Sequence, residues 1–156
     1  RLMITLYLVS CGILKKPILY LSDFFEKNRS TYYDKLMQVR ERNDLDGWIR
    51  FFLTGVISTA KSSIQTFDGI LKLQRETDQK LQSLGARAAN AQKVVNDLYR
   101  RPLISADRTS KVADVSLPTA YKLIQSLEEL GILQEITGFE RNRLYVYGEY
   151  IDLFRS

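Results

Sequence analysis

The stretch VSLPTAYKLIQSLEELGIL, residues 115–133, decides how the C-terminal half of the chain folds. Ser116 is placed to cap a helix that we predict to begin at Leu117, and the Leu-Gly-Ile-Leu step at residues 130–133 ends it. Such a helix can read DNA or can serve only as a scaffold, and the flanking residues bear on which role applies. Its apolar positions recur at helical spacing and form an inner stripe: Ala120, Leu123, Ile124 and Leu127.

Two further helices are predicted upstream of this stretch. Residues 91–100 carry apolar side chains on one helical face, and Pro102 breaks the pattern. Ser105 is placed to cap a short helix that runs to Ala113, and residues 114–116 make the turn that follows. The order is therefore helix, helix, turn, helix.

A β-hairpin is predicted downstream. The alternating runs LQEIT (residues 133–137) and RLYVY (143–147) are joined by GFERN (138–142), so the hairpin tip is basic and aromatic. Three short helices followed by such a hairpin make the winged helix-turn-helix arrangement, in which the third helix can lie in a major groove and the wing beside it on the backbone. Alternation places Leu144 and Val146 on one face of the second run and Arg143, Tyr145 and Tyr147 on the other.

The outward positions of the third helix and the wing are the candidate DNA contacts. The side chains opposite the inner stripe and near the helix start are placed to meet base edges, and the two wing arginines are placed to contact phosphate. Glu129 faces away from this contact or opposes it. The candidate residues are Pro118, Thr119, Tyr121, Lys122, Gln125, Arg141 and Arg143.

The charge of the chain is unevenly distributed. The formal net charge is +5, yet residues 90–156 hold nine basic and nine acidic residues, so the whole surplus lies in residues 1–89. Phosphate neutralisation normally supplies a large part of DNA affinity. Two roles for the winged helix therefore stay open, namely DNA binding and the docking of a partner or a second copy.

The N-terminal half predicts a series of helices. Amphipathic helices are expected at residues 18–27 and 29–39, and a polar joint at 44–47 leads into a longer helix that ends at Gly85. The apolar stripe of that long helix keeps helical phase over more than twenty residues, and we expect it to pack as core. The stripe consists of Trp48, Phe51, Phe52, Val56, Ile57, Ala60, Ile64, Phe67, Ile70 and Leu71.

The composition limits the chemistry that the chain can perform. It contains no histidine and a single cysteine, Cys11, so the commonest general base is missing and a zinc site is not expected. We predict no catalytic residue and no metal ligand. The lone cysteine fits a reducing cytoplasm. The apolar opening RLMITLYLVSCGIL is shorter than the roughly 20 residues of a membrane helix and lacks a signal-peptide cleavage pattern, so no membrane partner is expected.

Most of the chain resembles one protein family. The segment PILYLSDFFEKNRSTYYDKLMQVRERNDLDGWIRFFLTGV (residues 17–56) is similar to the stretch that follows the catalytic motif in the Fic family, named for filamentation induced by cAMP. SLPTAYKLIQSLEELGILQEITGFERNRLYVY (116–147) resembles the C-terminal winged helix of many members, and YGEYIDLF (147–154) resembles their tyrosine-rich end. The likeness is weakest in residues 72–92.

The resemblance implies a fold and an activity. The expected fold is mainly α, with residues 1–85 completing a Fic-type helical core and adding a long connecting helix, and residues 90–156 forming a winged helix-turn-helix domain with a small β-hairpin. The full-length parent would transfer AMP from ATP, with Mg²⁺, to a hydroxyl of a target protein. Arg1 would align with the last arginine of the catalytic motif, a phosphate-contacting position. The other motif residues have no counterpart here, so we expect a fragment that is not itself an enzyme.

Two other interpretations remain. The chain is alternatively a transcriptional regulator whose helical front half senses a ligand or dimerises, without transferase activity. A structural helical homodimer, built on the stripe that begins at Trp48, is the third interpretation.

Overall fold

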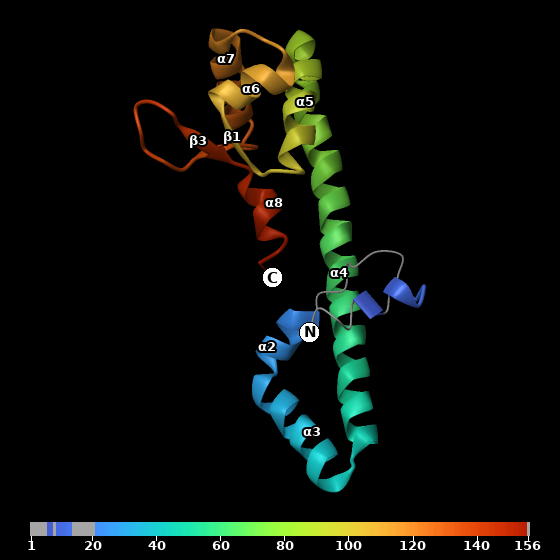
Figure 1. Cartoon of the computed structure of the whole chain (residues 1–156). Coiled ribbons are helices and arrows are strands. Elements are labelled where there is room, and N and C mark those ends of the chain that lie inside the picture. Colours follow the sequence, from blue (N-terminus) through green and yellow to red (C-terminus); the bar gives the residue numbers. More distant parts are fainter. Residues whose placement is uncertain (1–5, 8, 14–20, 156) are drawn as a thin grey trace. The chain divides into compact units, whose positions relative to one another are not determined.

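A computed structural model describes residues 6–7, 9–13 and 21–155 and is mainly helical with a small three-stranded antiparallel sheet (Figure 1). The predicted mainly α class is confirmed. The chain divides into two compact units between Gln65 and Thr66, inside the longest helix. The elements are α2 (Leu21–Lys27), α3 (Arg29–Arg42), α4 (Leu45–Gln82), the 3₁₀ turn Gly85–Arg87, α5 (Ala88–Leu98), β1 (Leu103–Ser105), α6 (Ala106–Ala113), α7 (Leu117–Glu129), β2 (Gln134–Glu135), β3 (Leu144–Val146) and α8 (Gly148–Asp152).

The predicted polar joint before the long helix is shorter than expected. Asn43 takes a left-handed conformation with φ of 54° and ends α3. The Asp44 carboxylate then accepts a hydrogen bond from the Gly47 amide at 3.0 Å, which satisfies an amide of the first turn of α4. The cap allows α4 to begin at Leu45, three residues before the predicted start.

The first unit is held by a small aromatic cluster between α2, α3 and α4. Leu21 and Phe25 are buried at its centre. Gly55 of α4 lets the ring of Phe24 approach the helix closely. The partly buried residues around the centre are Phe24, Tyr32, Phe51, Phe52 and Val56.

The expectation that the whole stripe of the long helix packs as core is wrong for its second half. Ile57 is 55% exposed, and Ile64 and Phe67 are 61% and 57% exposed. Ala60 and Leu71 are exposed as well. Helical periodicity tells which side chains share a face but not whether the same chain covers that face.

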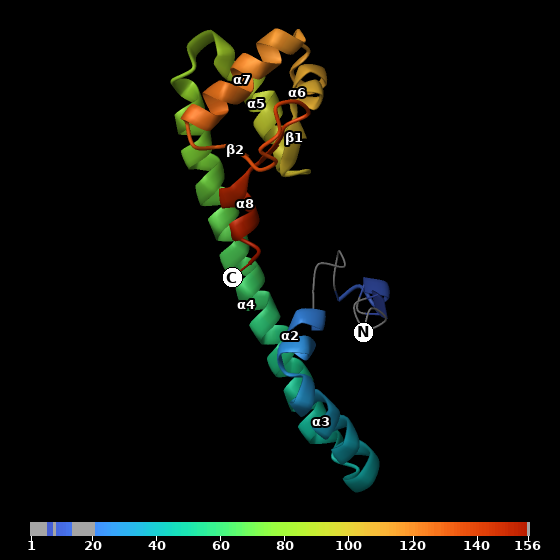
Figure 2. The same cartoon turned by 90° about the vertical axis from the view of Figure 1, so that its left-hand side faces the viewer.

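The second unit packs α5, α6 and α7 beside the sheet (Figure 2). β3 is the central strand, antiparallel to β1 and β2, and its Tyr145 lies opposite Ile104 of β1 and Glu135 of β2. Sequence reasoning had no strand at residues 103–105, where it found only a helix break. This strand exists because residues about forty positions later supply its hydrogen-bonding partner.

The last turns of α4 belong to the core of the second unit. Leu73 and Leu81 are buried there, and Thr77 forms a 2.6 Å hydrogen bond with the hydroxyl of Tyr147. The predicted boundary between residues 85 and 90 would separate these turns of α4 from the elements on which they pack. The hydroxyl of Thr66 in α4 donates to the carbonyl of Leu153 at 3.5 Å, so the residue that follows α8 contacts α4.

None of the described helices is both long and apolar enough to cross a bilayer.

Candidate nucleic-acid interface

The inner stripe of α7 is buried as the sequence predicts. Ala120, Leu123, Ile124 and Leu127 are all 3% exposed or less. Burial of this face points the opposite face of α7 to solvent. The predicted helical contacts on that face are all exposed: Pro118, Thr119, Tyr121, Lys122 and Gln125.

The start of α7 is organised by two hydroxyl groups. Ser116 precedes the helix with extended backbone, and its hydroxyl bonds the Thr119 hydroxyl at 2.8 Å rather than a backbone amide. Pro118 lies in the first turn, where its missing N–H costs no helical hydrogen bond. The side chain of Ser116 therefore makes no capping hydrogen bond, contrary to the predicted cap, and Thr119 is exposed at the start of the helix.

Gln125 is engaged within its own helix. Its side-chain NH₂ donates to the Glu129 carboxylate at 3.1 Å. An approaching base must exchange this hydrogen bond, which lowers the gain from a Gln125 contact. Glu129 thus lies one turn beyond Gln125 and brings a negative charge beside the candidate contacts.

The loop between β2 and β3, which is the predicted wing, is held in place by several hydrogen bonds. The Glu135 carboxylate accepts hydrogen bonds from the Thr137 hydroxyl and from the amides of Thr137, at 2.8 Å, and Gly138, at 2.9 Å. These bonds, led by that from the Thr137 hydroxyl, hold the pKa of Glu135 below its usual value. The Arg143 guanidinium donates to the Phe139 carbonyl at 2.7 Å.

The two predicted wing arginines are exposed. The Nε–H group of Arg143 donates to the Phe139 carbonyl, and this hydrogen bond holds the guanidinium group in place. The terminal nitrogens of the guanidinium lie beyond the bonded Nε. Large apolar side chains also lie at the wing, because Ile136 is 52% and Phe139 61% exposed.

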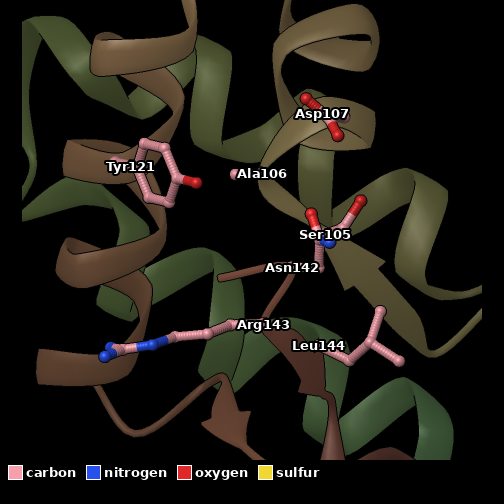
Figure 3. A pocket seen from close by; sticks show the side chains of 7 residues that line it. All are labelled: Ser105, Ala106, Asp107, Tyr121, Asn142, Arg143 and Leu144. Atoms are coloured by element: carbon pink, nitrogen blue, oxygen red, sulfur yellow. The ribbon is translucent and has the colours of Figure 1, made fainter. Parts of the chain in front are cut away.

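A hollow of about 240 Å³ lies between α7, the start of α6 and the wing (Figure 3). Tyr121 extends over it from α7 with its hydroxyl directed toward Ala106, and Arg143, the residue before β3, extends along its edge toward α7. The structure thus brings together two candidate contacts from different elements. The lining residues are Ser105, Ala106, Asp107, Tyr121, Asn142, Arg143 and Leu144.

Sequence reasoning missed Asp107 and Asn142 as neighbours of the interface. Asp107 lies in the first turn of α6, and its carboxylate opposes an anionic ligand in the hollow. No local signal could have found this, because pairing of β1 with β3 brings the start of α6 to the wing.

Arg108, the nearest basic residue on α6, is already paired. Its Nε and one terminal nitrogen donate to the two Asp97 oxygens at 2.7 and 2.8 Å, which joins α6 to α5. The hydrogen bond from Arg108 holds the pKa of Asp97 below its usual value. Arg108 therefore supports the scaffold of the interface rather than adding a free cation to it.

The remaining predicted site residue, Arg1, lies outside the described residues. No family model matches the chain. Among residues 6–7, 9–13 and 21–155, no group of three or more acidic or cysteine side chains is arranged to hold a metal ion.

Proposed function

We propose that residues 90–156 form a winged helix-turn-helix module that binds duplex DNA, with α7 in the major groove and the wing on the phosphate backbone. The observation that carries the proposal is the exposure of every candidate contact on α7 and the wing, in a unit ordered α5, β1, α6, α7, β2, β3. A buried inner stripe on α7 supports it further, since the helix is held firmly while its outer face stays open.

The contacts divide into two kinds. Thr119 and Tyr121 lie near the start of α7, where base contacts are usually made, and Lys122 follows one position later. Arg141 and Arg143 contact phosphate from the wing and set the orientation of the module on the duplex. Gln125 contacts a base only after its hydrogen bond to Glu129 breaks, so its contribution to DNA affinity is small.

The expected binding is weak and sensitive to salt. Lys122, Arg141 and Arg143 are exposed, whereas Asp107 and Glu129 lie close to the same surface. If about two to four phosphates are contacted, the logarithm of affinity falls against the logarithm of salt concentration with a slope of roughly −2 to −4.

Fluorescence anisotropy with duplex from the region upstream of the gene tests this proposal. Arg143→Ala should reduce the slope by about one unit. Lys93→Ala is the matched control, because Lys93 is an exposed cation on α5 outside the interface. Undetectable binding at low salt, or binding unchanged by the combined loss of Lys122, Arg141 and Arg143, refutes DNA binding.

The second part of the proposal places the chain in a cytoplasmic Fic-type protein whose parent transfers AMP from ATP, with Mg²⁺, to a protein hydroxyl. Its support is the resemblance of residues 17–56 and 116–154. The catalytic motif of the family contains the runs His-Pro-Phe and Gly-Asn-Gly-Arg, and gene sequence that encodes both upstream of Arg1 is the expected finding. Its absence favours the transcriptional regulator without transferase activity.

The chain alone should not transfer AMP, because it contains no histidine. Incubation with labelled ATP and Mg²⁺ should leave the chain and added lysate proteins unlabelled. Label that increases with the amount of purified chain contradicts this expectation.

A further inference from the structure

Six exposed apolar residues of α4, most of them from the predicted stripe, have the spacing of a coiled-coil seam. These residues follow one another at steps of four, three, four, three and four, which is the a and d pattern of a heptad repeat. All of them are exposed although they lie in the middle of a continuous helix. This heptad seam consists of Leu53, Ile57, Ala60, Ile64, Phe67 and Leu71.

Within the part of the chain that the structure describes, the side chains that pack closely on α4 do so at positions outside the seam. In the first unit, α2 packs its Phe24 against Gly55 of α4. In the second unit, Leu153 packs against Gly69, and Leu73 and Thr77 enter the core. None of these α4 positions belongs to the seam, so packing inside each unit leaves the seam side chains open.

The size of the seam is sufficient for an interface of modest strength. Its five large side chains are between 49% and 61% exposed. At roughly 100 Å² each, two copies would bury about 1,000 Å² in total, near the lower limit of specific interfaces. An apolar patch of about 500 Å² on one chain lies within the range of about 300–600 Å² of the largest patch on a typical monomer, and such patches are often functional.

The residues beside the seam fit a second copy of the chain. Within residues 53–71, the positions beside the seam are mostly uncharged, and the two charged ones, Lys61 and Asp68, have opposite signs. A flank with one sign of charge would repel its own copy, whereas a balanced flank is compatible with a self-complementary interface. A partner of strong charge gains nothing from this surface.

We propose that two copies of this chain associate through the heptad seam of α4 as a helical coiled-coil dimer. The proposal is independent of DNA binding, because the seam shares no residue with α7 or the wing. An interface near the lower size limit is typical of weak or transient complexes, so we expect the dimer to form only at raised protein concentration.

Sedimentation velocity from about 1 μM to about 500 μM chain tests the dimer. The mass of the wild-type chain should rise from 18.1 kDa toward the mass of two copies. Ile64→Glu places a charge in the seam and should keep the chain monomeric over the whole range. Met37→Glu is the matched control, because Met37 of α3 is 57% exposed, close to the 61% of Ile64; it should dimerise like the wild type.

Far-UV circular dichroism should show unchanged helix content in both variants, and Ile57→Glu replaces Ile64→Glu if the latter loses helix. A wild-type chain that stays monomeric at every concentration overturns the proposal and assigns the seam to another protein. It is equally overturned if masses exceed two copies, if both seam variants still dimerise, or if Met37→Glu abolishes association as well.

Discussion

The hydrogen bond between Thr77 and Tyr147 should couple the end of α4 to the last strand energetically. The two hydroxyl oxygens lie 2.6 Å apart, and both side chains are at most 1% exposed. Burial raises the pKa of the Tyr147 phenol. Thr77→Val keeps the shape of the side chain but leaves the Tyr147 hydroxyl without this partner.

The magnitude follows from the cost of an unpaired buried hydroxyl. That cost is about 1–3 kcal/mol, and the hydroxyl of Tyr99, which is buried close by, offers Tyr147 a replacement. We therefore expect Thr77→Val to lower the free energy of unfolding by about 1–2 kcal/mol. Tyr147→Phe should cost about 1 kcal/mol, since the Thr77 hydroxyl can turn to a carbonyl one turn back in its own helix.

The double variant distinguishes the hydrogen bond from packing alone. With both hydroxyls removed, no partner is left unpaired within this pair, so the double variant should cost no more than Thr77→Val alone. The coupling energy of the cycle is then about 1 kcal/mol. Urea unfolding followed by circular dichroism measures each value. Thr54→Val is the control, because Thr54 is exposed on the same helix, and it should change stability by less than about 0.5 kcal/mol. Costs that simply add within about 0.3 kcal/mol refute the coupling.

Two further predictions concern the supports of each unit. The hydrogen bond from Arg108 lowers the folded-state pKa of Asp97 below its ordinary value, so the pairing stabilises the fold above that ordinary value and is lost as the pH falls through the folded-state pKa. Asp97→Asn should therefore flatten the loss of unfolding free energy between about pH 5 and pH 2, and an unchanged acid profile contradicts the pairing. Gly55→Ala should lower the free energy of unfolding by about 1–2 kcal/mol despite its gain in helix propensity, because the new methyl carbon would lie 2.6 Å from the Phe24 ring. Urea unfolding measures the change, with Ser58→Ala on the same helix as the control. If Gly55→Ala is stabilised relative to this control, the Phe24 ring moves freely out of the way.

Local patterns predicted α7 and its exposed face from the sequence. The inner stripe at three- and four-residue steps identified the buried side of the helix, and the remaining positions had to face solvent. Ser105 was likewise recognised as a cap, and its hydroxyl accepts from the Arg108 amide at 3.4 Å. These features depend on residues within one or two turns of each other, so the sequence contains what is needed to predict them.

Pairing between distant segments decided the sheet and the hollow. β1 has only three residues and follows Pro102, so nothing local marks it as a strand until β3 lies beside it. Alternation separated Tyr145 from Leu144, but only the packed structure buries Tyr145 at 3% exposure and leaves Leu144 40% exposed.

The long helix shows the same division most clearly. The sequence by itself determined that residues 48–71 are helical with one apolar stripe, because periodicity is a property of neighbouring residues. Only the tertiary structure decided which part of that stripe is covered. Phe51 and Phe52 pack with α2 and α3, whereas Ile57 and Ile64 stay exposed. The physical reason is that burial requires a second apolar surface, and its position depends on how the rest of the chain folds.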